Sequence, residues 1–431
     1  MKRNKILSLV PILGVAVLAA GCSWNSVSVT SIEKTASYTY EDVYTVNFSD
    51  GTSSVLTVQH GKDITVQDVY DRFKEEYGDT LSYEEFLEKY LTLTYKPSAT
   101  VVNECLLSSF EVTTSKYTGS AVLYAINEDK NDAYILTNYH VIYNTGSYGG
   151  GSVDSNISCS LFGSEQTSFS CTYMGGSAQS DIALLRANLN EIKAVNEDVR
   201  PVTLASGYTV GETVYAIGNS EGLGISATKG IVSVDSEEVQ MNVDGKNRTH
   251  RVMRIDAAIY HGNSGGGLFN AEGELIGITN GGKETEQSIN YAIPVSIVKG
   301  TADNILHYYT DGDNSTSGAY KITLGVNVLS QNSRFVYNGG NGYIKEDLVV
   351  ADSDITTRYS IAYYTLKLQK NDILTGIQIN EKSFSLNRAY DIYDALLTAR
   401  AGDVIKLEYT RSGEQCTTSA YTIKRSDLNA I

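Results

Sequence analysis

Proline and basic residues are both scarce in this chain. Only 4 of its 431 residues are proline, and 34 Lys and Arg stand against 50 Asp and Glu, which gives a formal net charge of −16. An acidic surface repels nucleic acid and anionic lipid, so we expect no nucleic-acid partner. The 42% hydrophobic and 19% charged residues exclude a disordered chain, and the 38 Gly and 31 Tyr are typical of turn-rich β structure.

Long apolar runs are also missing, with one exception at the N-terminus. Residues 6–18 form an apolar run too short to span a bilayer, and basic residues stand before it at positions 2, 3 and 5. The run ends in Leu-Ala-Ala-Gly-Cys, which resembles the cleavage box of bacterial lipoproteins. The resemblance implies a signal peptide over residues 1–21, lipidation of Cys22, and an extracytoplasmic protein held at a bacterial cell membrane by acyl chains. An uncleaved or ordinary secretory signal is the alternative.

Cysteine is rare and lacks the spacing of metal sites. The sequence has no Cys-x-x-Cys and no His-x-x-x-His, so we expect no metal site. No organic cofactor is implied either. Apart from Cys22, the cysteines are Cys105, Cys159, Cys171 and Cys416. Cys159 and Cys171 flank a candidate hairpin, and the sequence is compatible both with a disulfide there and with two unpaired thiols.

The first hundred residues predict a tether and a small module. A chain of this length is expected to hold two to four domains. The Ser- and Thr-rich composition of residues 22–37 predicts a tether. Residues 38–100 predict an α+β module of unknown role, with a hairpin over 44–58 followed by two short helices.

The remainder of the chain is mainly β. Residues 101–308 show many short strands separated by Gly, Asn and Ser clusters, without the alternating helices of a parallel α/β sheet. A polar linker is expected over 309–319, and a last module over 320–431 combines strands with an amphipathic helix over 389–399.

Three short motifs follow one another in the order His, Asp, Ser. Thr-Asn-Tyr-His-Val contains His140, Ser-Asp-Ile-Ala-Leu contains Asp181, and Gly-Asn-Ser-Gly-Gly places Ser264 among glycines. A serine between glycines can sit in a tight turn whose amides point at one spot, as a tetrahedral oxyanion requires. The order and the contexts resemble the chymotrypsin-type serine proteases, and this resemblance implies a double β-barrel.

Further segments narrow the resemblance to the HtrA (Deg) branch of these proteases, over about residues 118–300. The segments that carry it are Asp256–Ile259, Ala216–Asn219, Gly222–Gly224, Gly230–Ser233, Gly273–Ile278 and Asn290–Pro294. The resemblance implies that Ser264 is the nucleophile, His140 the general base and Asp181 its orienting partner. The amides of Gly262 and Ser264 would form the oxyanion hole, the substrates would be proteins or peptides, and the assembly would be a homotrimer.

Each of these residues also has a structural interpretation. His140 could be a core histidine beside a strand, and Asp181 a polar residue at a strand start, but only the ordered set explains all three motifs together. Asn263 stands where trypsin-like zymogens place an aspartate that pairs with a newly cut N-terminal amine. Activation by such a cleavage would therefore lack its ion pair.

Two binding regions are expected besides the triad. The specificity pocket is predicted to hold a small or medium apolar side chain, since no carboxylate stands among its walls, Ile278, Thr279 and Asn280, with Ala258 and Ile259 opposite. In the last module, residues 368–377, the helix around 395–397 and residues 402–405 resemble a PDZ domain of the HtrA kind, with Asn371 in place of the usual glycine. The resemblance implies that a peptide C-terminus is captured at the backbone of Leu324, Gly325 and Val326. The alternatives to an HtrA-type endopeptidase are a peptide-binding chaperone or sensor with little proteolysis, and a processing protease for one surface protein.

Overall fold

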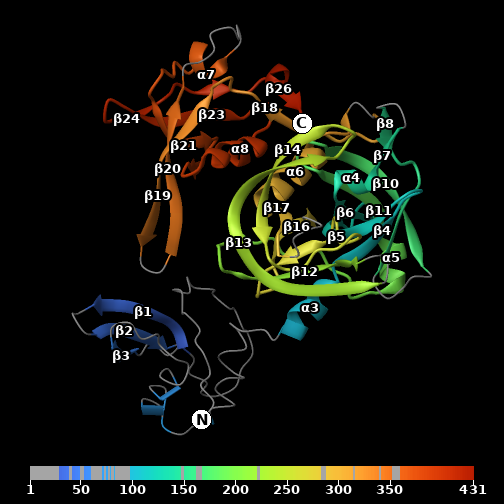
Figure 1. Ribbon diagram of the computed structural model, residues 1–431, viewed down its shortest axis with the longest axis horizontal. Helices are drawn as coiled ribbons and strands as arrows, with labels where there is room; N and C mark the ends of the chain where they lie inside the picture. The colour runs from blue at the N-terminus through green and yellow to red at the C-terminus, as the bar shows by residue number, and fades with distance from the viewer. Residues whose placement is uncertain are drawn as a thin grey trace. The chain divides into compact units, whose positions relative to one another are not determined.

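A computed structural model describes a large part of the chain. The described residues are 29–37, 41–48, 53–59, 70–71, 74–75, 78, 82 and 98–431, the last range without 147–149, 162–166, 221–223, 283–287, 314–315, 339–340 and 352–359. The expected signal peptide over 1–21 and the lipidation site Cys22 lie outside these residues. The chain forms two compact units, residues 1–96 with 337–343 and residues 97–336 with 344–431 (Figure 1).

The first unit contains an antiparallel sheet of strands β1 (Val29–Ser37), β2 (Glu41–Phe48) and β3 (Ser53–Gln59). The hairpin expected over 44–58 is confirmed, because Tyr44 pairs with Leu56. The tether expected over 22–37 is wrong for residues 29–37, which form β1 through pairing with β2. The two expected helices lie largely outside the described residues, although positions 70, 71, 74 and 75 are helical.

The second unit begins with helix α3 (Ser98–Leu106) and a closed barrel. The strand order in this barrel is β10-β11-β6-β5-β4-β9. Its strands are β4 (Ser109–Thr113), β5 (Thr118–Asn127), β6 (Asp132–Thr137), β9 (Ile157–Leu161), β10 (Ser168–Ser177) and β11 (Ile182–Asn188). Helix α4 (Tyr139–Ile142), strands β7 (Tyr143–Thr145) and β8 (Gly151–Val153), and helix α5 (Leu189–Val195) lie in its connections.

A second closed barrel follows, in the order β12-β13-β14-β17-β16-β15. Its strands are β12 (Thr213–Asn219), β13 (Ile225–Asn242), β14 (Asn247–Ile255), β15 (Gly267–Phe269), β16 (Leu275–Gly282) and β17 (Asn290–Pro294). The chain then enters helix α6 (Val295–Tyr308). The expected mainly β architecture with two barrels is confirmed.

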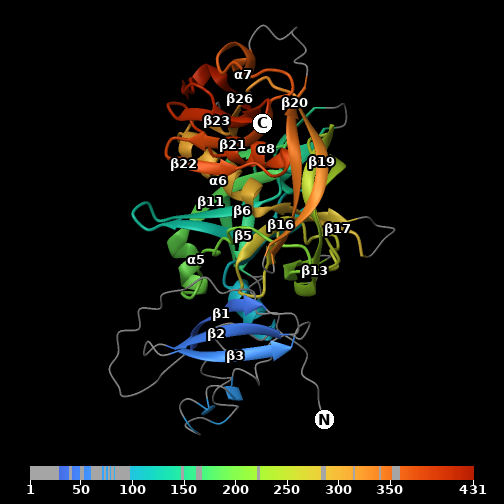
Figure 2. The same cartoon turned by 90° about the vertical axis from the view of Figure 1, so that its left-hand side faces the viewer.

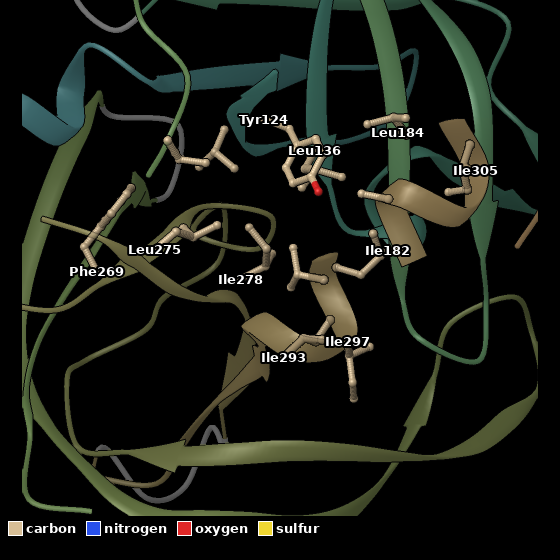
Figure 3. Close-up of a cluster of buried hydrophobic side chains, with 14 of the residues drawn as sticks. Tyr124, Leu136, Ile182, Leu184, Phe269, Leu275, Ile278, Ile293, Ile297 and Ile305 are labelled. Carbon is tan, nitrogen blue, oxygen red and sulfur yellow. The ribbon is translucent and has the colours of Figure 1, made fainter. Parts of the chain in front are cut away.

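The two barrels share one hydrophobic core (Figure 3). Leu136 and Leu184 of the first barrel, Ile278 of the second and Ile297 of α6 are all fully or almost fully buried in it. Each buried aliphatic side chain of this size contributes about 1.5–3 kcal/mol of burial free energy. The shared core therefore holds the barrels in a fixed relation, and a site built from both can keep its geometry.

The C-terminal module has its own core and a mixed set of short elements. Its main sheet has the order β19-β20-β21-β23-β24, with β22 paired to β21 and β25 to β23, while β18 pairs with β26. The strands are β18 (Tyr320–Ile322), β19 (Val328–Asn338), β20 (Asn341–Val350), β21 (Ile373–Ile379), β22 (Lys382–Ser385), β23 (Val404–Arg411), β24 (Glu414–Thr417), β25 (Tyr421–Thr422) and β26 (Leu428–Ala430). The helices are α7 (Ile361–Tyr364) and α8 (Ala389–Leu397), the second within the predicted range.

Helix α8 packs against the second barrel and α6 (Figures 1 and 2). Arg251 of β14 pairs with Asp394 of α8 at 2.5 Å, and both side chains are mostly buried. Arg388, just before α8, pairs with Asp235 of β13 at 2.6 Å, and the Arg251 guanidinium lies 4.4 Å from the centre of the Tyr390 ring. These contacts fix the C-terminal module on the barrels. Among the described residues, no helix combines the length and the apolarity that crossing a bilayer needs.

Candidate active site

The first element of the site is an imidazole–carboxylate pair between two connections of the first barrel. His140 lies in the short helix α4 after β6, and Asp181 lies just before β11. The His140 Nδ1 atom is 2.7 Å from Oδ2 of Asp181, and the His140 amide donates to Oδ1 at 2.9 Å. Helix α4 has no side-chain cap at its N-terminus, so Asp181 satisfies amides that the helix itself cannot pair.

Asp181 is fully buried and has a left-handed backbone, with φ of 50°. Aspartate tolerates this conformation better than most residues do, yet it is still uncommon and needs support from the surroundings. Its carbonyl accepts from the Asn138 side chain at 2.9 Å and from the Tyr139 amide at 3.2 Å. Its Oδ2 also accepts from Nδ2 of Asn280 at 2.6 Å. The carboxylate is therefore held in a single orientation.

The electrostatics of His140 follow from this pairing. The imidazole is partly covered, with 29% of its side chain exposed. Burial opposes its positive charge, but attraction to the Asp181 carboxylate and the hydrogen bond to it prevail, and together they raise the pKa of His140 above its usual value. The pair can therefore stabilise an imidazolium that forms when His140 accepts a proton.

Ser264 comes from the second barrel and borders the same hollow as His140. Its turn runs through Gly262 and Gly265, whose φ angles of 92° and 88° favour glycine. The Ser264 hydroxyl donates to the carbonyl of Asn280 at 2.8 Å. To donate to another acceptor, such as Nε2 of the imidazole, this hydroxyl would have to rotate away from the Asn280 carbonyl.

The turn also presents unpaired amides. Neither the Gly262 nor the Ser264 amide donates to an acceptor among the described residues. The Gly262 carbonyl instead accepts from the Ser120 hydroxyl at 2.7 Å, and the Gly265 amide donates to Thr279 at 2.9 Å. Two free amides that flank a hydroxyl have the composition of an oxyanion hole.

Asn263 is held by neutral partners. Its side chain is 3% exposed, and Oδ1 accepts from the hydroxyls of Ser220 at 3.2 Å and Ser226 at 3.4 Å. Its carbonyl accepts from the Thr279 hydroxyl at 2.6 Å. Hydrogen bonds to the end of β12 and the start of β13 thus support the turn at the position where zymogens form an ion pair with a new N-terminus.

The hollow beside Ser264 has a volume of about 900 Å³. Its walls come from β13, the segment before the serine turn and the end of β16, and include Glu237, Glu238, Met241, Ala258, Ile259 and Gly281. Of the three residues of β16 expected to wall the specificity pocket, only Asn280 borders this hollow. Ile278 lies in the core shared by the barrels, and the Thr279 hydroxyl is buried against the serine turn.

The sequence did not reveal that Asn280 binds both halves of the site. Its side chain donates to Asp181 and its carbonyl accepts from Ser264, so it bridges the carboxylate and the serine turn. Strand β16 carries a register shift between Thr279 and Gly281 where it pairs with β17. Such an irregularity re-aims side chains locally and is not readable from sequence alternation.

The segment expected to bind a peptide C-terminus lies after β18 in the C-terminal module. Leu324 is buried in the module's core, and Gly325 has φ of 69°. The Ser360 hydroxyl donates to the carbonyls of Leu324 and Gly325, at 3.3 and 2.6 Å. The amides of Leu324, Gly325 and Val326 donate to no acceptor among the described residues. The carbonyls are thus fixed on one side while the amides stay available.

Comparisons with known proteins find relatives among the serine proteases. Residues 119–278 match the model of the trypsin-like peptidase domain family. The chain is 27% identical over 321 residues to the serine protease Do-like HtrA of Lactococcus lactis subsp. cremoris, and the alignment covers 72% of each chain. It is 32% identical over 180 residues to the serine endoprotease DegS of Haemophilus influenzae, and this alignment covers 41% of this chain and 47% of the relative.

A solved structure shares the fold. The HtrA-type protease AlgW with a tripeptide superposes with a TM-score of 0.50 at 21% identity, over 78% of this chain and 98% of that one. At this identity the likeness concerns the fold alone.

Proposed function

This chain belongs to the HtrA-type serine proteases of the trypsin fold and is a serine endopeptidase, and on that premise we propose that Ser264, His140 and Asp181 are its catalytic triad. The observation that carries the proposal is the 2.7 Å contact between His140 and a buried Asp181, made at the hollow that Ser264 borders. A buried carboxylate on Nδ1 selects the tautomer whose Nε2 can accept a proton.

The proposed reaction begins when the Ser264 hydroxyl turns from the Asn280 carbonyl towards His140. The hydroxyl oxygen attacks the scissile carbonyl carbon while its proton passes to Nε2, and Asp181 stabilises the imidazolium. The substrate's carbonyl oxygen becomes an oxyanion, which accepts hydrogen bonds from the Gly262 and Ser264 amides. His140 then returns the proton to the leaving amine, which breaks the peptide bond. A water attacks the acyl-enzyme by the same route and releases the acid.

The substrates are proposed to be misfolded or exported proteins. An open hollow of about 900 Å³ accommodates an extended peptide, whereas a compact folded surface would not enter it. To test this, one unfolded protein and its folded form are incubated with the wild-type chain, with Ser264→Ala and with Ser206→Ala, which alters an exposed serine outside the site. We expect the wild type and Ser206→Ala to cleave the unfolded form alone. Equal cleavage by Ser264→Ala would contradict the nucleophile assignment.

The residue before the cleaved bond is proposed to be small or medium-sized and apolar. Gly281 borders the hollow at the end of β16, and among the described residues a Cβ added there would lie within 4 Å of Met241 alone. Ala258 and Ile259 add apolar surface from the opposite side. Two carboxylates, Glu237 and Glu238, also border the hollow from β13, and Glu237 lies 3.5 Å from Arg254. A substrate library that favours Arg or Lys directly before the cut would overturn this proposal.

The C-terminal module is proposed to be a PDZ domain. The available amides of Leu324, Gly325 and Val326 would bind a peptide carboxylate, and the peptide would extend along the outer strand β19. Titration of Ser264→Ala with a fluorescent peptide measures binding without cleavage. The same peptide with an amidated C-terminus is the control, and equal affinity for both forms would contradict the proposal.

The protein is also proposed to be an extracytoplasmic lipoprotein that assembles as a homotrimer. The signal-like start and the lipoprotein box at Cys22 support the first part, and membership of the HtrA-type family supports the second. Cys22→Ser should release the protein from the membrane fraction of a bacterial host. Light scattering of the released protein should give the mass of three chains, and the mass of one chain would contradict the trimer.

A further inference from the structure

Ser120 lies at the point where the first barrel meets the serine turn. It belongs to β5 and is completely buried, in a core strand where an unpaired hydroxyl would cost free energy. Its hydroxyl is hydrogen-bonded in both directions, since Oγ donates to the Gly262 carbonyl at 2.7 Å and accepts from the Asn219 backbone amide at 2.8 Å. The side chain thus connects three segments that are far apart in the sequence.

The backbone of Ser120 makes a second set of bonds to the same region. Its amide donates to the Ser264 carbonyl at 2.8 Å, and its carbonyl accepts from the Thr137 hydroxyl at 2.8 Å. Thr137 ends β6, just before His140. The approach is so close that a Cβ on Gly265 would collide with the Ser120 carbonyl. One residue therefore sets the distance between the serine turn and the strand that leads to the imidazole.

The bond to Gly262 bears directly on the free amides. Gly262 has φ of 92° and no Cβ, so its own sterics leave the neighbouring peptide planes free to rotate. Ser120 holds the Gly262 carbonyl, and through its amide it holds the Ser264 carbonyl. These two carbonyls lie in the 262–263 and 264–265 peptide planes, which adjoin the planes of the Gly262 and Ser264 amides, and the Asn263 carbonyl between them is held by the Thr279 hydroxyl. Holding these planes restricts how far the Gly262 and Ser264 amides can rotate. An oxyanion hole is effective only when its donors are oriented before charge develops.

We infer that Ser120 is a positioning residue for the oxyanion-binding turn, acting through the Gly262 carbonyl without touching the substrate. The inference rests on the proposed function, because it assigns the Gly262 and Ser264 amides to the oxyanion. Loss of the hydroxyl leaves the His140–Asp181 pair intact. Its effect therefore falls on the stabilisation of the transition state, and the binding of uncharged peptide is unaffected.

The test compares Ser120→Ala with Ser109→Ala. Ser109 is 1% exposed and donates to the Cys105 carbonyl at 2.8 Å, so its variant loses a buried hydroxyl of the same kind away from the turn. For Ser120→Ala we expect kcat on a peptide substrate to fall about ten- to a hundredfold with KM nearly unchanged, below the ~10²–10³-fold cost of deleting a donor outright. Ser109→Ala should keep the wild-type kcat.

Three further measurements separate positioning from general destabilisation. Affinity for a peptide boronic acid, whose adduct places an oxygen in the oxyanion hole, should fall by the same factor as kcat, while affinity for the matching peptide amide stays constant. The acid limb of the kcat/KM profile should not move, because His140 is untouched. If Ser120→Ala fails to show a cooperative melt, Ser120→Cys, which keeps a weak donor, replaces it and should lose part of kcat.

The outcomes point to different failures. An active wild type with an equally active Ser120→Ala, or equal losses in Ser120→Ala and Ser109→Ala, would overturn the inference. A parallel loss of affinity for the boronic acid and the amide would also overturn it. A wild-type chain that neither cleaves peptides nor binds the boronic acid would overturn the proposed function itself.

Discussion

Replacing Asp181 by asparagine perturbs the proposed triad at its most constrained point. Oδ1 of Asp181 accepts from the His140 amide, and Oδ2 accepts from His140 Nδ1 and from Asn280 Nδ2. An asparagine offers one oxygen and one amide group in place of two acceptors. As long as Nδ1 keeps its proton, a donor therefore faces a donor wherever the amide group points.

The two orientations are not equally costly. With the new amide group towards the His140 backbone, one hydrogen bond is lost. With the amide group towards the imidazole, Nδ1 must accept, so the proton moves to Nε2. Asn280 can turn over in this case, because its buried Oδ1 accepts no bond among the described residues. The second arrangement keeps the hydrogen bonds to the side chain at position 181, at the expense of moving the Asn280 NH2 group to the place where Oδ1 has no partner among the described residues. It leaves Nε2 unable to take the proton of Ser264.

We therefore expect Asp181→Asn to lower kcat by ~10³–10⁴-fold, as the wrong tautomer and the lost charge do in another serine protease. This loss corresponds to about 4–5.5 kcal/mol of activation free energy. Asparagine adopts left-handed backbone readily, so the variant should still fold.

The assay is cleavage of a fluorogenic peptide by the wild type, Asp181→Asn and the exposed-site control Asp198→Asn, each with a thermal melt. Asp198→Asn should match the wild type. A loss of less than about tenfold in a folded Asp181→Asn variant would refute the role given to this carboxylate.

Three other predictions follow from the charges of the structure. Because the pKa of His140 is raised, kcat/KM should fall as pH drops through a midpoint above the ordinary value of ~6.5, and a midpoint below that value would contradict the pairing with Asp181. Arg251→Met should lower the free energy of unfolding, measured in urea, by about 3 kcal/mol because it leaves Asp394 buried and unpaired. The double variant Arg251→Met with Asp394→Leu should lose clearly less, and equal losses would refute the contribution of the buried pair. The buried His250 ring has no hydrogen-bond partner among the described residues, and burial lowers its pKa. The unfolded chain therefore binds more protons than the folded chain below pH ~6.5, and the stability of the fold decreases there. His250→Leu should reduce the loss of stability between melts at pH 7 and pH 5, and an unchanged loss would contradict this role of His250.

The sequence predicted the fold where local patterns decide it. Short strands with Gly- and Asn-rich turns predicted the β architecture, and the resemblance carried by separated motifs implied two barrels. Asn371 has a left-handed backbone with φ of 69°, a conformation that asparagine tolerates better than most residues do. These features depend on residues that lie close together in the chain, so they are legible without the structure.

Other features depend on pairing between distant segments. Residues 29–37 resemble a tether in composition and become β1 only because β2 pairs with them. Ile278 and Asn280 lie on the strand expected to wall the pocket, but Ile278 enters the core between the barrels and Asn280 binds Asp181. Ser120 carries no motif that marks it, since its role comes from its contacts across the barrels with Gly262 and Asn219.

The structure does not choose between the two states that the sequence allows for Cys159 and Cys171. Cys159 and Cys171 lie on the neighbouring strands β9 and β10, with their sulfur atoms 3.0 Å apart and both thiols free. Because the two sulfur atoms lie this close, both predicted alternatives, a disulfide and two thiols, are compatible with the structure. The hydrogen bond with Cys171 and burial raise the pKa of the Cys159 thiol, so this thiol is a poor nucleophile.

Covalent labelling measures the convergence of His140, Asp181 and Ser264 most directly. The chain is treated with a peptidyl phosphonate ester that carries a small apolar side chain, and the adduct is located by mass spectrometry of peptides. A single adduct on Ser264 in the wild type, lost in His140→Ala, is the predicted result. Modification of another residue, or stoichiometric modification of Ser264 without His140, would contradict the proposed catalytic site.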